Sequence, residues 1–183
     1  MPSYHVDRLG KLQAGQSVSP QPLDKEQLSV RIDRLGTTVD IRDPLKAWFP
    51  DGLTNHGGAY TLMAWRGVPK VGLDGAQVSE IIFELIRRLE FQNRPSRLQS
   101  MFACASLPEA EAFRAGYGKP SNRIFEVRSA TTFAGDMNLL FCGTCPAAAI
   151  ELARKYWREE RSSTPVLEVL LGPPVTVVRQ VDP

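Results

Sequence analysis

Cys142 and Cys145 form a C-x-x-C motif that follows an apolar segment and precedes a helix signal. A helix N-terminus stabilises a thiolate, so this spacing suits a dithiol oxidoreductase. A thioredoxin-type fold, however, needs more sheet and helix than the 38 residues that follow Cys145. A zinc site needs four ligands, and the chain adds one cysteine and two histidines without a second paired spacing. The motif therefore favours a tight turn with small half-buried thiols, and redox and metal chemistry stay as alternatives.

The phosphate-binding and hydrolase motifs are missing from the sequence. There is no G-x-x-x-x-G-K-[ST], and no G-x-G-x-x-G lies between a strand and a helix. Neither a G-x-S-x-G elbow nor a Cys–His pair is visible. These absences argue against a kinase, a Rossmann dehydrogenase and an α/β-hydrolase.

Three dispersed polar residues remain as candidates for chemistry: His5 between Tyr4 and Val6, Arg97 after a Pro-Ser pair, and Glu168 in an apolar run. An unpaired buried carboxylate is costly, so Glu168 indicates either a partner or a function. Periodicity alone favours the simpler interpretation that Glu168 lies on the solvent face of an alternating strand. Taken singly, His5 is typical of a hydrogen-bonded structural histidine and Arg97 of an ion-pairing arginine.

The elements that must position these residues follow from apolar periodicity. Residues 4–6 predict a short strand ending at Gly10, and residues 23–35 predict a helix from the spacing of Leu28, Ile32 and Leu35. Residues 36–75 carry repeated prolines and glycines, which predict a long functional loop inside one domain.

The middle of the chain gives the clearest helix signal. Apolar residues predict one buried face, with Glu84 and Arg88 paired on the outer side and a capping-box-like start at Asp74. That face comprises Val78, Ile81, Ile82, Leu85, Ile86 and Leu89. Residues 97–106 predict a buried strand, and a capping box at Ser106 opens a helix that ends near Gly116.

The C-terminal third predicts a strand over residues 123–128 and a helix that begins at Cys145-Pro146. The expected buried face of that helix contains Ile150, Ala153 and Trp157. Strands at 166–171 and 175–181 are joined by a Gly-Pro-Pro segment, which predicts a hairpin-type connection. This mixed order predicts a single α+β domain over residues 1–183.

Composition sets the broad class of the protein. The chain has 183 residues, 43% hydrophobic and 23% charged, with a net charge of +2. These values are typical of one globular domain and give no electrostatic reason to expect nucleic acid or an anionic membrane as partner. Three cysteines and an N-terminus interrupted by Asp7 and Arg8 predict a cytoplasmic protein, with a leaderless secreted effector as the alternative.

Taken together, the dispersed residues resemble the ADP-ribosyltransferase superfamily. In that superfamily a His or Arg on an early strand, a Ser- or Tyr-bearing middle strand and a Glu on a late strand surround the nicotinamide end of NAD. The chain is particularly similar to a bacterial family of uncharacterised proteins regarded as divergent members of that fold. The matching stretches span nearly the whole chain: Tyr4-His5-Val6-x-Arg8 with Leu12 and Gly15-Gln16, Asn55-His56-Gly57-Gly58-x-Tyr60, Pro95-Ser96-Arg97, Ala153-x-x-Tyr156-Trp157 and Glu168-Val169-Leu170-Leu171.

The resemblance implies split antiparallel sheets with flanking helices and NAD as substrate. It implies that Glu168 bonds the 2′-hydroxyl of the nicotinamide ribose and stabilises an oxocarbenium-like state. His5 would bond a ribose hydroxyl, while Ser96 and Arg97 would hold the nicotinamide ribose and the pyrophosphate. The other expected NAD contacts are Arg8, His56, Tyr60 and Tyr156, with Tyr60, Tyr117 or Tyr156 stacking on nicotinamide.

The sequence also departs from the superfamily pattern. It has no Ser-Thr-Ser triplet, and Val166 stands where enzymes that modify arginine carry the first member of an E-x-E or Q-x-E pair. The expected activity is therefore ADP-ribosyl transfer to an unspecified protein or nucleic-acid target. The alternatives are a catalytically inactive binding module of the same fold and a dithiol redox protein using Cys142 and Cys145.

Overall fold

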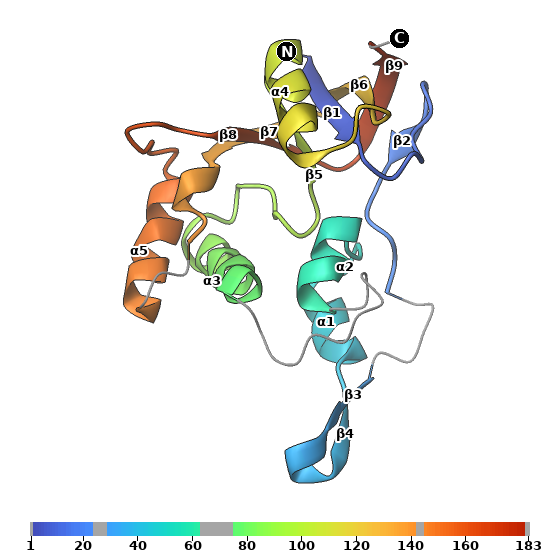
Figure 1. Cartoon of the computed structure of the whole chain (residues 1–183). Coiled ribbons are helices and arrows are strands. Elements are labelled where there is room, and N and C mark those ends of the chain that lie inside the picture. The colour runs from blue at the N-terminus through green and yellow to red at the C-terminus, as the bar shows by residue number, and fades with distance from the viewer. Residues whose placement is uncertain (1, 24–28, 63–74, 142–144, 182–183) are drawn as a thin grey trace.

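A computed structural model describes residues 2–23, 29–62, 75–141 and 145–181. Two antiparallel sheets lie above a layer of helices, with a small hairpin below them (Figure 1). The predicted single α+β domain is confirmed.

The larger sheet has the order β1-β6-β9-β2, formed by β1 (Ser3–Asp7), β6 (Arg123–Arg128), β9 (Val175–Gln180) and β2 (Ser17–Val18). The predicted strands at 4–6 and 123–128 are thus confirmed, and they pair with His5 opposite Phe125. Because opposed residues share a face, the side chain of His5 lies on the same side as Phe125.

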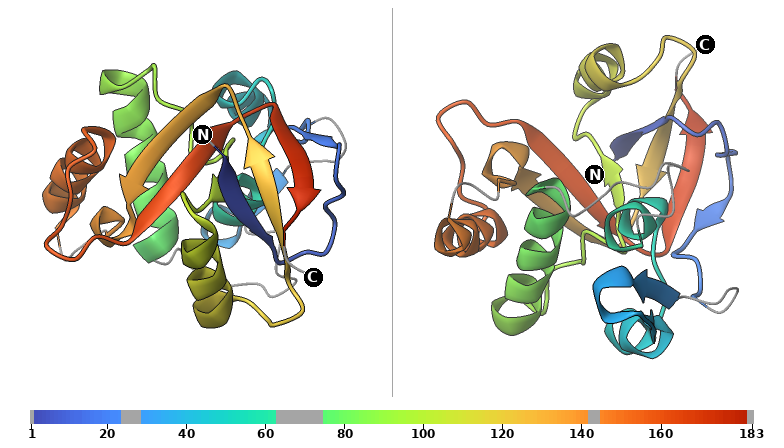
Figure 2. Two further views of the ribbon diagram at one scale, coloured as in Figure 1. Left: turned by 90° about the horizontal axis from the view of Figure 1, so that it is seen from above. Right: turned by 60° about the horizontal axis from the view of Figure 1, so that its bottom comes forward.

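The smaller sheet has the order β5-β8-β7, formed by β5 (Met101–Ala103), β8 (Leu167–Gly172) and β7 (Thr131–Asp136). Tyr4 and Cys104 exchange backbone hydrogen bonds of 2.9 and 2.8 Å, which join β1 to the end of β5. Seen from above, the strands of the smaller sheet lie beside those of the larger sheet (Figure 2). The molecule is therefore built on a split antiparallel sheet.

The alternation of β8 separates two environments. Val169 and Leu171 pack with Phe125 and Val177 in the apolar core between the two sheets. Leu170 lies in a second core formed with the helices α3 (Gly75–Glu90) and α5 (Pro146–Trp157). Since side chains alternate along a strand, Glu168 shares the helix-facing side with Leu170.

The expected hairpin between residues 166–171 and 175–181 is wrong. β8 pairs with β5 and β7, whereas β9 pairs with β6 and β2, so the connecting Gly172-Pro173-Pro174 segment carries the chain from one sheet to the other. The sequence indicated two strands correctly, but adjacency along the chain did not imply pairing.

The helix α4 (Leu107–Tyr117) confirms its predicted capping box: Ser106 accepts from the Glu109 N–H, and the Glu109 side chain accepts from the Ser106 N–H. It covers one side of β1, where Ala110 packs with Val6. On the other side of the sheets, α3 packs on α5, and the indole of Trp157 donates to the Phe83 carbonyl at 2.9 Å.

The predicted buried face of α3 is correct only in part, because Ile86 is buried and Ile81 and Ile82 pack half-buried against the core. Leu85 and Leu89 are 38% and 73% exposed, whereas Glu80 and Glu84 are buried. Both carboxylates find arginine partners inside the protein, which stabilises the charged face against the core. On α5, Ala153 and Trp157 are buried as expected, but Ile150 is exposed.

Three further expectations need correction. The end of the expected helix at 23–35 is instead β3 (Ser29–Ile32) and a 3-10 turn, η1 (Asp33–Leu35). The expected loop at 36–75 contains β4 (Thr37–Asp40), which pairs with β3, and the helices α1 (Arg42–Trp48) and α2 (Asn55–Thr61). The expected strand at 97–106 is limited to β5, because residues 97–99 form a turn. Asp74 and residues 63–73 of that loop lie outside the described residues.

Candidate functional site

Glu168 lies at the centre of a buried polar cluster. Tyr156 on α5 donates its hydroxyl hydrogen to Glu168 Oε1 at 2.8 Å, and Arg97 donates to the same oxygen. Arg97 also donates to the Tyr156 oxygen at 2.7 Å, which closes a triangle. Among the described residues, both hydrogen bonds to Glu168 end on Oε1, and the side chain is 7% exposed.

Glu80 on α3 completes the cluster from the opposite side. Its two carboxylate oxygens accept from Arg97 Nε at 2.9 Å and from the terminal nitrogen Nη2 at 2.8 Å. This is a bidentate pair, whose geometry only an arginine provides. The second terminal nitrogen, Nη1, points to Glu168 and Tyr156. The described donors of Arg97 are thus directed to protein groups.

Electrostatics fixes the charge states within this cluster. Burial alone would raise the pKa of Glu80, but the charges of Arg97 and His56 hold it well below the usual range. Burial would lower the pKa of Arg97, but Glu168 and Glu80 raise it further above its ordinary value. Burial also raises the pKa of Tyr156. At neutral pH the cluster therefore contains a cationic Arg97, an anionic Glu80 and a neutral Tyr156 hydroxyl.

His56 is more exposed to solvent than the buried residues of the cluster. It lies on α2, whose first turn is capped by Thr54, and its Nε2 is 3.1 Å from Glu80 Oε1. Its ring contacts those of Tyr60 and Phe102, with centroids 4.4 and 4.5 Å away. The His56 side chain is 24% exposed, more than the 4% of Arg97 or the 7% of Glu168.

Ser96 belongs to a neighbouring network rather than to this cluster. Its hydroxyl donates to Glu84 Oε2 at 2.9 Å, and Glu84 also accepts from Arg87 and Arg88. The pairing of Glu84 with Arg88 was predicted, but on the outer side of the helix, whereas the Glu84 side chain is fully buried. This network fixes the segment that carries Arg97.

His5 lies on β1, the strand that bridges to the end of β5. Its Nδ1 lies 2.6 Å from the Phe102 carbonyl oxygen, and because a carbonyl only accepts, Nδ1 carries the hydrogen. Burial lowers the pKa of His5, so the ring is neutral at pH 7 and Nε2 is a hydrogen-bond acceptor. His5 on β1 and Glu168 on β8 thus lie on the two strands that neighbour β5. The Phe102 carbonyl of β5 contacts His5, and the Phe102 ring lies beside Arg97.

Arg8 is not part of the cluster. It follows β1 and lines an open pocket of about 450 Å³ beside the C-terminal end of α4, together with Tyr117. The structure thus brings together Glu168, Arg97, Tyr156, His56 and, through the His56 ring, Tyr60, and it places Arg8, Ser96 and Tyr117 elsewhere.

Sequence reasoning missed Glu80, which makes the most contacts with Arg97. The sequence does contain a pattern that indicates it: Glu80, Glu84 and Arg87 are spaced by four and three residues, so they lie along one face of α3. The apolar stripe on the other side of the helix concealed it, since apolar residues were taken to mark the buried face.

Two of the three cysteines, Cys104 and Cys145, lie in the described residues. Cys142 lies outside the described residues, so the expected dithiol is not described as a pair. Cys145 is exposed at the start of α5, and hydrogen bonds from the Ala148 and Ala147 N–H groups lower its pKa. Burial raises the pKa of Cys104 to about 11. Within the described ranges, no three His, Cys, Asp or Glu side chains are grouped to hold a metal ion.

No helix of the described part is long and apolar enough to cross a membrane. A comparison with curated proteins returns no match. A comparison with protein families matches residues 3–183 to the family described as "Protein of unknown function (DUF2441)". Because this match covers almost the whole chain, the protein belongs to the DUF2441 family.

Proposed function

We propose that this protein is an NAD-dependent ADP-ribosyltransferase that acts on a protein or nucleic-acid target. The observation that carries the proposal is the position of Glu168 on the central strand of the smaller sheet. Among the described residues, both hydrogen bonds to its side chain end on the oxygen Oε1. The second oxygen, Oε2, then accepts from the 2′-hydroxyl of the nicotinamide ribose. A carboxylate fixed in this way stabilises positive charge without moving during the reaction.

The chemistry needs a charge stabiliser rather than an activated nucleophile. The bond between C1′ of the ribose and the nicotinamide nitrogen breaks, and its electron pair leaves with nicotinamide. The sugar becomes oxocarbenium-like until a target nucleophile forms a new bond to C1′ and gives up its proton to solvent. Glu168 lowers the energy of the cationic state, and the neutral His5 accepts a ribose hydroxyl at Nε2.

The roles of two residues differ from those that the resemblance implies. Arg97 bonds Glu80, Glu168 and Tyr156, so it positions Glu168 instead of holding the pyrophosphate. Ser96 bonds Glu84 and positions the turn before β5. The rings of His56 and Tyr60, tilted by 31° to each other, offer aromatic contacts for nicotinamide next to the same cluster.

The experiment combines calorimetric titration of the protein with NAD and a nicotinamide-release assay. Glu168→Gln keeps the size of the side chain and removes its charge, so release should fall about 100-fold or more while NAD still binds. Glu90→Gln is the matched control, because Glu90 is also paired with an arginine but lies on the surface. Unchanged release in Glu168→Gln would exclude the proposed role.

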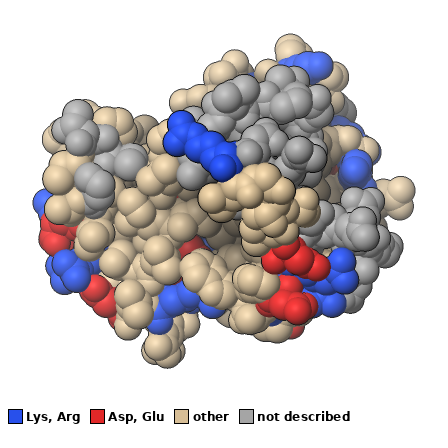
Figure 3. Space-filling model, turned by 90° about the horizontal axis from the view of Figure 1, so that it is seen from below, with Lys and Arg blue, Asp and Glu red and all other residues tan. Residues whose placement is uncertain are grey.

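A binding module without catalysis is the second candidate. It is favoured by the low exposure of Glu168, 6% for the whole residue, and by the closed triangle with Arg97 and Tyr156. The charges on the face seen from below are of both signs and do not form one continuous patch (Figure 3). In that case NAD neither binds nor releases nicotinamide, and Glu168→Gln changes only stability.

A further inference from the structure

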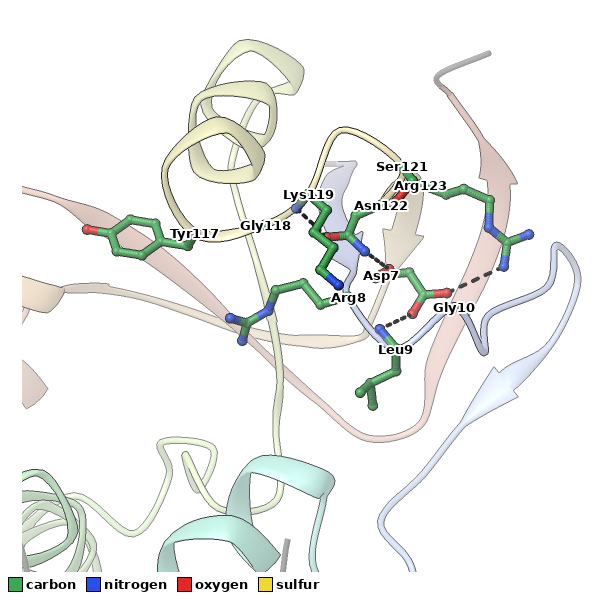
Figure 4. Close-up of a pocket in the computed structure, with 10 residues that line it drawn as sticks. All are labelled: Asp7, Arg8, Leu9, Gly10, Tyr117, Gly118, Lys119, Ser121, Asn122 and Arg123. Atoms are coloured by element: carbon green, nitrogen blue, oxygen red, sulfur yellow. Dashed lines mark hydrogen bonds and ion pairs between the residues drawn. The ribbon is translucent and has the colours of Figure 1, made fainter. Parts of the chain in front are cut away.

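The pocket beside α4 lies apart from the Glu168 cluster. One wall is formed by residues 7–10, at the end of β1 and just after it, and the other by residues from the end of α4 to the start of β6 (Figure 4). Its volume of about 450 Å³ is within the range of small-molecule sites, roughly 300–1,000 Å³.

The one carboxylate in this pocket is already neutralised by the protein. Asp7 is 3% exposed, and its oxygens accept from the N–H groups of Leu9 at 3.1 Å and Leu12 at 2.8 Å. Arg123 lies 3.6 Å from it. Burial would raise the pKa of Asp7, but the backbone hydrogen bonds lower it. Asp7 is therefore a fixed internal anion and does not pair with the remaining cations of the pocket.

Those remaining cations are Arg8 and Lys119, both exposed. No carboxylate of the described residues forms an ion pair with either one. Three cations, including Arg123, against the single carboxylate of Asp7 leave two positive charges in the pocket. A phosphate monoester carries about 1.5 to 2 negative charges at pH 7, so its charge matches this surplus.

Hydrogen bonds within the protein join the two walls of the pocket in the absence of a ligand. Asn122 donates from its side chain to the Asp7 carbonyl at 3.3 Å and accepts from the Lys119 N–H at 2.7 Å (Figure 4). The Asn122 N–H donates to the Lys119 carbonyl at 2.9 Å. A preformed frame of this kind lowers the ordering cost of binding.

We propose that this pocket binds a phosphate monoester carried by a small molecule, with Arg8 and Lys119 as its charged contacts. The planar fork of an arginine matches phosphate oxygens, and the lysine adds a compact second charge. The inference does not rest on the proposed transferase activity. NAD carries a pyrophosphate and no terminal phosphate, so the two ligands are distinguishable.

The test titrates the protein with adenosine monophosphate, inorganic phosphate and adenosine. The two phosphates should bind and adenosine should not, and binding should weaken as salt is raised. The double variant Arg8→Gln with Lys119→Gln should weaken binding at least about tenfold. The double variant Lys155→Gln with Arg158→Gln removes the same charge at the C-terminal end of α5 and should bind as the wild type does.

Glu168→Gln should bind adenosine monophosphate normally, which separates this site from the proposed catalytic carboxylate. Equal binding of adenosine, or no binding of either phosphate, would overturn the proposal. Displacement of adenosine monophosphate by NAD would also overturn it, because the pocket would then belong to the dinucleotide site.

Discussion

At the scale of single residues, Arg97 connects three elements. It lies in the turn before β5, bonds Glu80 on α3 through two donors, and bonds Tyr156 on α5 and Glu168 on β8 through a third nitrogen. Its guanidinium also lies over the Phe102 and Tyr156 rings, with its carbon 5.0 and 5.3 Å from their centroids. A lysine offers a single charged point and cannot serve both carboxylates in this geometry.

Arg97→Ala should lower the free energy of unfolding by about 3–5 kcal/mol, because it leaves Glu80 and Glu168 buried without their cation. Urea denaturation followed by circular dichroism measures the change. Arg154→Ala, which breaks the partly exposed pair with Glu90, should lower the free energy of unfolding far less, because solvent screens an exposed ion pair. Similar losses in both variants would show that the cluster is not tightly coupled.

The pKa of His5 predicts a pH dependence. Burial lowers this pKa in the folded protein, so below about pH 6.5 the unfolded chain binds more protons than the folded one. Stability should therefore fall as the pH is lowered from 7 to 5, by at most about 1.4 kcal/mol per pH unit for this group.

His5→Gln should reduce that loss, because its amide can still donate to the Phe102 carbonyl but does not titrate. Denaturation midpoints at pH 7, 6 and 5 provide the measurement. Glu80, Asp7 and Asp136 also have lowered pKa values, but as carboxyls they act below about pH 4.5. The same slope in His5→Gln and wild type would contradict the assignment.

The sequence identifies Glu168 and Arg97 as candidate site residues, but it does not identify Glu80, which pairs with Arg97. Glu168 was identified because a carboxylate in an apolar strand needs an explanation. Glu80 was not, because a glutamate in a helix is normally solvated and nothing local distinguishes a buried one. Which side of α3 is buried depends on Arg97, which is 17 residues away in sequence.

At the scale of elements, β7 and α5 meet at a glycine. A Cβ added at Gly135 would lie 2.2 Å from the Tyr156 ring, so only glycine allows this approach. Tyr156 is thereby placed where its hydroxyl bonds both Arg97 and Glu168. The geometry of the cluster depends on how closely the strand and the helix pack.

Gly135→Ala should destabilise the protein by about 1–3 kcal/mol, since a methyl group overpacks a filled core. It should also reduce any nicotinamide release, because Tyr156 is displaced from Glu168. Gly116→Ala is the control: it lies in α4 with open space around it and should raise stability by about 0.4–1 kcal/mol. Thermal melts of the two variants should shift in opposite directions.

Local sequence patterns predict individual helices and strands better than they predict which strands pair with each other. The capping box at Ser106 and the strand at residues 123–128 depend on neighbours within a few residues, and both predictions are confirmed. The separation of β8 and β9 into different sheets depends on β6 and β5, which are far away along the chain. No spacing within residues 166–181 contains that information.

At the scale of the whole molecule, the described parts differ in how firmly they are held. β6 lies between β1 and β9, with Ile124 and Val127 fully buried. The β3–β4 hairpin extends away from the sheets, and all four residues of β4 are exposed (Figure 1). Such differences in burial correspond to differences in local opening.

Amide hydrogen exchange should therefore be about 100-fold or more slower in β6 than in β4. The amides of Tyr4 and Cys104 should be protected like those of β6, because they join the two sheets. Mass spectrometry after a time course in deuterated buffer resolves these segments. Equal exchange in β4 and β6 would indicate that the hairpin is held by the body of the protein.

The contact between Trp157 and Tyr156 gives the molecule an internal optical reporter. The indole is fully buried, its centroid is 4.8 Å from the Tyr156 ring, and Tyr156 is bonded directly to Glu168. A molecule that binds Glu168 should therefore change the fluorescence of this indole, and no added label is needed to detect the binding. With the other two tryptophans, Trp48 and Trp65, replaced by phenylalanine, the emission of Trp157 would follow occupancy of the site in real time.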